Sequence, residues 1–218
     1  MVNKLFYNTV SPLLHDVLKT LMNANELVQF RLVGGTALSL YRGHRLSIDI
    51  DLFTDAKYGS IDYNAIDKYL RNTFNYVDTS NENIIGFGKS YFVGNDAENI
   101  IKLDIFYSNE AFLFPESIID ELRIAEVSEI VAMKTDVVSR GGRKKDFWDL
   151  HELMNDYTIN EMFKLHKQRH PFTHDKAILK ENFCSFTNAD LDFDPVCLKG
   201  KHWELIKLDM IDLVKELT

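Results

Sequence analysis

The amino-acid sequence predicts an α/β fold in which a small mixed β-sheet, flanked by helices, is followed by a helical C-terminal region. Strand-like runs occur before residue 126, among them 28–33, 48–53 and 100–106. Helical periodicity takes over from Val127 onward. Because strands and helices have apolar periods of two and about 3.6 residues, this change of period predicts a core over 1–125 and a helical region over 126–218.

The composition is that of a soluble globular protein. The chain has 218 residues, of which 45% are hydrophobic and 27% charged, enough to bury a real core. No run approaches the roughly 18 apolar residues of a membrane span, and no signal-peptide core follows Met1, so we expect a cytoplasmic protein without a membrane partner. The net charge of -8 argues against indiscriminate nucleic-acid binding, although it leaves room for a local basic patch. Cys184 and Cys197 lack metal-site spacing and are expected to be free thiols.

Two helices are predicted to cover the sheet near the N-terminus. Ser11 is expected to cap the first, with Pro12 in the first helical position, where its missing N–H costs nothing. The second is expected over 61–74. Both carry apolar residues at helical spacing, which is typical of a face packed on a core.

A phosphate-binding turn is predicted at Gly34-Gly35. These glycines follow the predicted strand 28–33 and precede a short helical run that begins at Thr36. Glycine lets the backbone pass close to a ligand. The first N–H groups of a helix lack internal partners and carry the positive end of its dipole, so the turn is suited to a triphosphate.

Acidic and apolar residues alternate in the strand at 48–53. The strand period of two directs Asp49 and Asp51 to one face. Two oxygen ligands opposite a phosphate turn are what a Mg²⁺-dependent phosphoryl or nucleotidyl transfer site requires. Asp104, which interrupts the apolar strand 100–106, is expected as a third carboxylate; the alternative is an aspartate on an edge strand that faces water.

A β-hairpin is predicted just before that strand. Its strands are expected at 84–87 and 91–93, with Gly88-Lys89-Ser90 as the turn between them.

The motif Gly34-Gly35-Thr36, followed on the next strand by Asp49-Ile50-Asp51, resembles the signature of the polymerase-β-like nucleotidyltransferase superfamily. The fuller pattern, with Arg45 and Ser47 before the aspartates, resembles the AbiEii/AbiGii-type nucleotidyltransferase toxins. The resemblance covers about 32–150 and implies the nucleotidyltransferase fold. It implies nucleotide-binding roles for Gly34, Gly35, Thr36, Arg45 and Ser47, and metal-binding, catalytic roles for Asp49, Asp51 and Asp104.

A basic glycine loop at 140–145 is the second informative stretch. With Lys134 before it and Asp146 and Asp149 after it, the loop resembles the segment that follows the core in the same family, which implies catalytic roles for Lys134 and Asp146. Its cations, including Arg140 and Arg143, are suited to a triphosphate or an RNA backbone.

Three features of this stretch remain open. Arg140 could instead complement the end of one helix while Asp146 caps the start of the next. Lys145 stands where the family pattern has an arginine, so we expect a charge contact there rather than a bidentate one. The helices of this region are expected from an N-cap at Ser128 to about residue 140, and at 145–156, 160–168, 175–183 and 203–217.

His166, His170 and His174 are spaced four residues apart, a spacing that invites a metal-site interpretation. Pro171 is expected to end the helix, so the three rings are not expected to share a face, and no histidine metal site is predicted.

Together, these patterns predict a nucleotidyltransferase dependent on Mg²⁺, or on Mn²⁺ in its place, that moves a nucleoside monophosphate from an NTP to an acceptor hydroxyl and releases pyrophosphate. The resemblance implies a toxin of a toxin–antitoxin or phage-defence system, with tRNA or another RNA as acceptor and a cognate antitoxin as partner. Two alternatives remain: transfer to a small molecule or a protein side chain, and a catalytically inactive interaction module of the same fold. Clustered carboxylates that repel one another argue against the inactive module.

Overall fold

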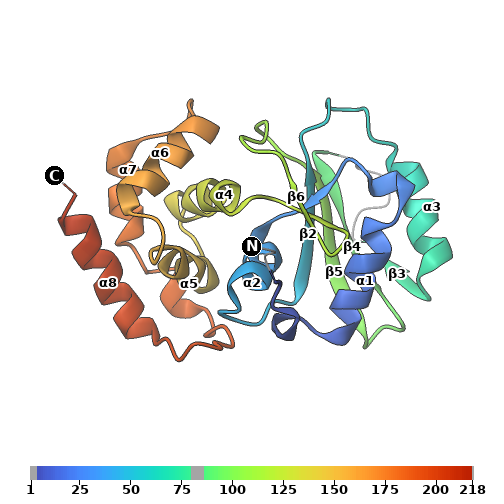
Figure 1. The fold of residues 1–218 in the computed structure, drawn as a ribbon, viewed down its shortest axis with the longest axis horizontal. Coiled ribbons are helices and arrows are strands. Elements are labelled where there is room, and N and C mark those ends of the chain that lie inside the picture. The colour runs from blue at the N-terminus through green and yellow to red at the C-terminus, as the bar shows by residue number, and fades with distance from the viewer. Residues whose placement is uncertain (1–3, 80–85, 218) are drawn as a thin grey trace.

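Seven strands form one mixed sheet in the computed structural model, which describes residues 4–79 and 86–217 (Figure 1). Their order is β3-β4-β5-β2-β1-β7-β6, in which β2 runs parallel to β5 and β1 to β7. The strands are β1 (Arg31–Leu32), β2 (Asp49–Thr54), β3 (Tyr76–Asp78), β4 (Gly88–Gly94), β5 (Ile100–Tyr107), β6 (Ser117–Ile119) and β7 (Leu122–Ile124). The predicted mixed sheet is therefore confirmed.

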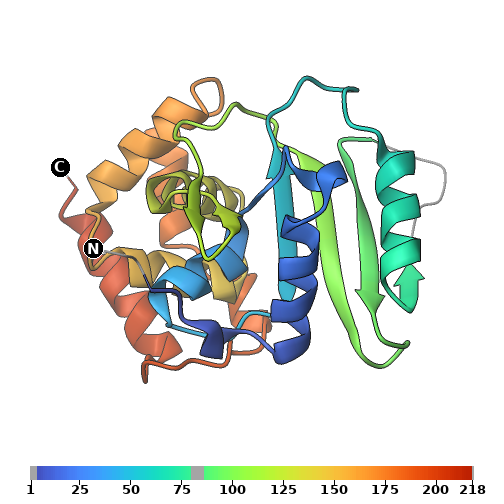
Figure 2. The same cartoon turned by 45° about the vertical axis from the view of Figure 1, so that its right-hand side comes forward.

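The helix α1 (Pro12–Met22) lies across β4, β5 and β2 on one face of the sheet (Figure 2). Ser11 caps it as predicted, because its Oγ accepts a hydrogen bond from the N–H of Leu14 at 3.1 Å. The helix α3 (Tyr63–Thr73) lies beside α1, where the hydroxyl of Tyr69 donates to the carbonyl of Thr20 at 3.2 Å.

Five helices gather at the other end of the molecule, and α2 lies between them and the sheet (Figure 1). They are α4 (Val127–Ser139), α5 (Lys144–Leu153), α6 (Ile159–Arg169), α7 (Lys176–Phe183) and α8 (Trp203–Lys215), while α2 spans Gly34–Arg42. Short 3-10 helices occur at Tyr7–Thr9, Asn25–Leu27 and Ala189–Leu191. The boundary expected at residue 126 falls between β7 and α4, and it stays a prediction because one continuous buried cluster includes side chains from both sides.

The predicted hairpin is wrong in its turn. Gly88, Lys89 and Ser90 lie inside β4, which pairs antiparallel with β3 and β5, whereas 84–85 lie outside the described residues. A Cβ on Gly88 would meet the carbonyl oxygen of Ile105, so this glycine permits close approach of two strands rather than a turn. Lys89 is buried and pairs with Asp67 at 3.3 Å.

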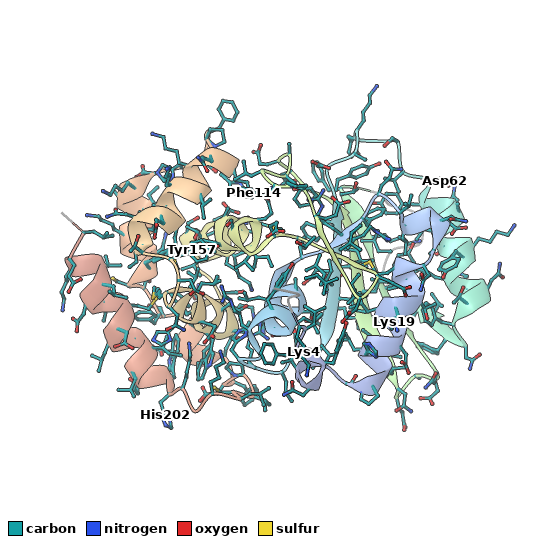
Figure 3. All side chains as sticks on the ribbon, viewed as in Figure 1. Lys4, Lys19, Asp62, Phe114, Tyr157 and His202 are labelled. Atoms are coloured by element: carbon teal, nitrogen blue, oxygen red, sulfur yellow. The ribbon has the colours of Figure 1, made fainter. Side chains whose placement is uncertain are left out.

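Two other expected boundaries differ. The strand expected at 28–33 is only Arg31–Leu32, because the chain forms a turn at 28–29, directly after the 3-10 helix Asn25–Leu27. Ser128 lies inside α4 rather than capping it, and its Oγ is 3.0 Å from the hydroxyl of Tyr157, the residue labelled in Figure 3.

The chain after α7 returns to the sheet. The N–H of Leu46 donates to the carbonyl of Val196 at 2.9 Å, and the N–H of Leu198 donates to the carbonyl of His44 at 2.9 Å. These bonds bring the segment 192–198 against the approach to β2, a placement that the sequence did not predict.

Candidate active site

The Gly34-Gly35 turn opens α2 directly after β1, as the sequence predicted. Gly34 has φ +71°, and a Cβ there would lie 2.5 Å from Oδ2 of Asp51. A side chain at this position would therefore be strained and would collide with the carboxylate. Val33 is the N-cap residue, and among the described residues no side chain caps α2, so its first N–H groups are available to an anion.

Asp49 and Asp51 lie on one face of β2, and Ile50 and Leu52 are buried on the other. Asp51 is in register with Asp104 on the neighbouring β5. The strand β5 is an interior strand, between β4 and β2, so Asp104 is not the edge-strand residue of the alternative interpretation. The sheet thus brings all three predicted carboxylates to one region.

The carboxylates differ in their surroundings. Burial raises the pKa of Asp51 to about 6, and the negative charges of Asp104 and Asp49 add to the increase while Lys134 opposes it. Asp104 accepts a hydrogen bond from Ser90 Oγ at 2.6 Å and pairs with Lys102. Asp51 is therefore the carboxylate that most needs a compensating positive charge.

Thr36 and Ser47 connect the turn to the aspartate strand. The Thr36 hydroxyl contacts Ser47 Oγ at 2.8 Å and also the carbonyl oxygen of Asp49. Both side chains are buried. In this structure they fix the spacing between α2 and β2.

A buried ion network lies behind the turn. The Lys134 ammonium is 2.7 Å from Oδ1 of Asp146 and 2.7 Å from Oδ2 of Asp149. Arg45 binds Asp149 in a bidentate manner, at 2.6 Å from Nε and 2.8 Å from Nη2, and His44 Nε2 lies 2.7 Å from the same carboxylate. A bidentate contact thus exists, but it joins Arg45 to Asp149.

The pKa values of this network follow from its pairing. Burial alone would raise the pKa of Asp149, but Arg45 and Lys134 hold it well below its usual value. Burial likewise opposes the charge on Lys134, and Asp149 and Asp146 raise its pKa in spite of this. Asp149, Lys134 and Arg45 are therefore all charged, and Lys134 has a second carboxylate partner in Asp146.

Two cavities adjoin at this site. The turn cavity, of about 240 Å³, lies beside the Gly34-Gly35 turn. The tail cavity, of about 330 Å³, is bounded by the segment 192–196. Ser47, Asp49 and Lys145 line both. The further residues of the turn cavity are Val33, Gly34, Gly35, Asp51, Phe53, Met133, Lys134, Val137 and Asp146.

The comparisons with known proteins identify the family. The model of the AbiEii nucleotidyl transferase toxins, described as belonging to type IV toxin–antitoxin systems, matches residues 16–216. The chain belongs to this family. It is therefore a nucleotidyltransferase, and the resemblance read from the two motifs is confirmed. A search of curated proteins finds no match.

Two solved structures share the fold of this AbiEii-family enzyme. JHP933 from Helicobacter pylori is 20% identical with a TM-score of 0.57, over 93% of this chain and 87% of that chain. MenT4, a nucleotidyltransferase toxin from Mycobacterium tuberculosis, is 14% identical with a TM-score of 0.58, over 94% of this chain and 84% of that chain. The predicted nucleotidyltransferase fold is confirmed.

The cations of the glycine loop make different contacts in this AbiEii-family enzyme. Lys145 Nζ lies 3.6 Å from Oδ2 of Asp49, between the two cavities. Arg143 is largely exposed in the tail cavity, with Nε 3.5 Å from Asp192. Lys144 is buried against Asp194 at 2.9 Å. Arg140, whose side chain is largely exposed, pairs with the mostly buried Asp136 and lines neither cavity.

The charge contact expected at Lys145 exists, but no local pattern predicted that its partner is Asp49. The residues of the segment 192–196, which line the tail cavity, were not predicted as part of the site. The alternative interpretation of the loop also describes part of the structure, because Arg140 follows α4 and Oδ2 of Asp146 accepts from the N–H of Arg143 at 3.0 Å. Asp146 therefore both caps α5 and binds Lys134.

The three histidines do not share one helix face, because α6 ends before Pro171 as predicted, but their rings nevertheless lie close together. The helix α6 does end at Arg169, but the following turn folds back and places His174 Nδ1 2.8 Å from His166 Nδ1. His170 also contacts His166, with ring centroids 5.1 Å apart.

Among the described residues, no helix of this AbiEii-family enzyme has the length and apolarity needed to cross a membrane.

Proposed function

We propose that this enzyme transfers a nucleoside monophosphate from an NTP to an acceptor hydroxyl with Mg²⁺ as cofactor. One observation carries the proposal: Asp49 and Asp51 line the turn cavity together with Gly34 and Gly35, which begin α2 at its uncapped N-terminus. In the reaction, the acceptor oxygen forms a bond to the α-phosphorus while the bond from that phosphorus to the pyrophosphate oxygen breaks. The turn, through Gly34, Gly35 and the start of α2, binds the β- and γ-phosphates.

The residues present fit a magnesium ion. Within 4–79 and 86–217, no three His, Cys, Asp or Glu side chains form a group able to hold a metal by themselves. Mg²⁺ does not require one, because it is commonly bound by one or two carboxylates together with substrate phosphates and water. Asp49 and Asp51 would hold it, with Asp104 beside them, and it would neutralise charge that develops on the phosphates. Mn²⁺ prefers similar oxygen ligands.

Three further residues have roles in this proposal. Asp104, next to Asp51 on the side away from the turn, accepts the proton of the acceptor hydroxyl. Lys134 lines the turn cavity and gives two of its three N–H donors to Asp146 and Asp149. Its third donor is available to a phosphate, and Lys145 supplies a second positive charge from α5.

The acceptor in this proposal is tRNA or another RNA, and the partner is a cognate antitoxin. The family's description as toxins of type IV toxin–antitoxin systems supports the partner. The basic side chains of Arg143 and Lys145, which line the tail cavity together with Asp49, support the binding of a polyanionic substrate at the site. Arg45 contributes through Asp149 rather than by direct contact with a phosphate.

The experiment combines NTP binding with product analysis. NTP and Mg²⁺ are titrated into the wild type and into Asp49→Ala/Asp51→Ala, and RNA and protein from complete reactions are analysed by mass. We expect metal-dependent NTP binding in the wild type alone, with a gain of one or more nucleotides on RNA.

The outcomes separate the alternatives. Mass gained by a protein or a small molecule, with turnover insensitive to salt, would move the acceptor away from RNA, because RNA binding weakens steeply with ionic strength. Absence of transfer with either metal and any acceptor would contradict the proposal.

A further inference from the structure

We propose that the tail cavity binds the nucleobase of the donor NTP, with Phe193 as its stacking surface. This inference rests on the proposed function, because it takes the triphosphate to lie on the Gly34-Gly35 turn. It gives the segment 192–196 a role in substrate recognition.

The lining of the tail cavity has the chemistry of a nucleobase site. Phe193 is 98% exposed and Ile48 is 73% exposed, and both line the same cavity from segments far apart in the sequence. Arg143 and Lys145 add positive charge at its edge. An aromatic ring with neighbouring aliphatic and cationic groups is the combination that binds bases by stacking, largely independent of their identity.

Phe193 is exposed but belongs to an anchored segment. On one side of it, the Asp192 carboxylate accepts from the N–H of Lys144 at 3.0 Å. On the other, Asp194 pairs with the Lys144 ammonium, and the Val196 carbonyl accepts from Leu46. The backbone that carries the ring is thus anchored on both sides of Phe193, which reduces the entropy lost when a base stacks on the ring.

The position of the cavity distinguishes donor from acceptor. In phosphoryl transfer, the attacking and leaving oxygens lie roughly in line. The leaving pyrophosphate is at the turn before α2, and the acceptor is at Asp104 on β5, so the nucleoside must extend sideways from the α-phosphate. The tail cavity lies at the start of β2, shares Asp49 with the turn cavity and has no lining residue from β5. The tail cavity therefore lies on the side toward which the nucleoside extends from the α-phosphate.

The cavity volumes agree with this assignment. Sites for small organic ligands have volumes of about 300–1,000 Å³. The turn cavity, at about 240 Å³, is too small for a whole NTP. The two adjoining cavities together lie within this range.

The test compares each NTP with inorganic tripolyphosphate, both with Mg²⁺, by calorimetry on the full chain. The affinity for tripolyphosphate measures binding at the turn alone. The ratio of the NTP affinity to the tripolyphosphate affinity measures what the nucleoside contributes. We expect Phe193→Ala and Ile48→Ala each to weaken NTP binding, by about 5-fold or more for Phe193→Ala, and to leave tripolyphosphate binding unchanged. The chain offers matched controls in Phe172→Ala and Ile118→Ala, which remove side chains that are 93% and 72% exposed away from both cavities.

Each other outcome overturns the assignment in a distinguishable way. If Phe193→Ala binds every NTP as the wild type does but raises the KM for the acceptor, the cavity holds the acceptor. If Val137→Ala, which alters only the turn cavity, weakens NTP binding and Phe193→Ala does not, the base lies on that side. If the wild type binds tripolyphosphate and NTP with equal affinity, the tail cavity does not bind the base, but the proposed function is not contradicted. If the wild type binds neither ligand, both proposals are contradicted: phosphate binding at the turn and base binding in the tail cavity.

Discussion

The sheet and the C-terminal helices bring charged groups to opposite walls of the turn cavity in contrasting ways. On the sheet, carboxylates gather without sufficient compensation, and the pKa of Asp51 rises to about 6. On the helices, Asp149 is fully buried, yet Arg45 and Lys134 hold its pKa well below its usual value. The charge of Asp51 is therefore incompletely compensated, whereas the charge of Asp149 is paired with two cations.

This difference separates two kinds of residue that look alike in a motif. Removing one partner from a buried ion network leaves an unpaired charge in a low-dielectric interior, at a high cost in stability. Removing a carboxylate from a cluster of like charges relieves repulsion. The network should therefore support the fold, while the carboxylates should lower stability and serve the reaction, a compromise that is common at functional sites.

The largest effect is expected for Asp149→Ala. This change leaves Arg45 and Lys134 without their shared carboxylate, so we expect the free energy of unfolding to fall by about 3–5 kcal/mol, measured by urea denaturation. The matched control is Asp212→Ala, which breaks an exposed pair with Lys215 and should cost less than about 1 kcal/mol. If Asp149→Ala does not fold, Asp149→Asn supplies the measurement. If Asp149→Ala lowers the free energy of unfolding only as much as the control does, the ion network does not support the fold and the proposed difference between the two walls is wrong.

Asp51→Asn should stabilise the protein without metal. Folding raises the pKa of Asp51 above its unfolded value of about 4, so the ionised group disfavours the folded state at pH above about 6. We expect a gain of about 1–2 kcal/mol at pH 7.5. The gain should disappear as the pH falls through about 4, where both states are protonated. Denaturation at the two pH values measures this.

Asp16→Asn is the control for this prediction, because its carboxylate is exposed, and its stability should not change. Mg²⁺ should raise the melting temperature of the wild type more than that of Asp51→Asn, since a ligand stabilises only the state that binds it. The prediction fails if Asp51→Asn lowers stability at pH 7.5, or if its gain persists at pH 4.

Lys145 should behave as a ligand-binding residue rather than as part of the network. Lys145→Gln removes a partly exposed charge 3.6 Å from Asp49, so we expect NTP affinity to fall about tenfold, the effect of losing one charge-assisted contact. The free energy of unfolding should change by less than about 0.5 kcal/mol. Lys215→Gln, at an exposed pair, is the control for calorimetry. A large loss of stability in Lys145→Gln would assign it to the scaffold instead.

Local patterns were sufficient to predict much of this site. The strand period placed Asp49 and Asp51 on one face, and the glycines placed the turn, because both depend on neighbouring residues. Capping at Ser11 was predictable for the same reason. The hairpin failed where a glycine served contact between strands: Gly88 faces Phe106, and no local pattern distinguishes that from a turn.

The rest of the site depends on contacts between distant segments. The pairing of Arg45 with Asp149 and the return of 192–196 to the start of β2 join residues more than a hundred positions apart. The cations of the glycine loop show best what local sequence patterns do not predict. Lys145 and Arg140 have the same charge and belong to the same loop, but the helix start that follows directs only Lys145 toward Asp49.

The smallest effect is expected for Arg140→Ala. Arg140 was a candidate for nucleotide binding, but its largely exposed guanidinium pairs with Asp136 four residues earlier and lines neither cavity. Pairs with this i,i+4 spacing contribute about 0.3–0.5 kcal/mol, so we expect a loss of stability of this order, and calorimetry should give the wild-type affinity for NTP. Arg143→Ala, in the tail cavity, is the informative comparison and should weaken NTP binding. A loss of NTP affinity in Arg140→Ala would mean that a bound ligand reaches beyond both cavities, to the end of α4, and that the glycine loop acts as one basic surface.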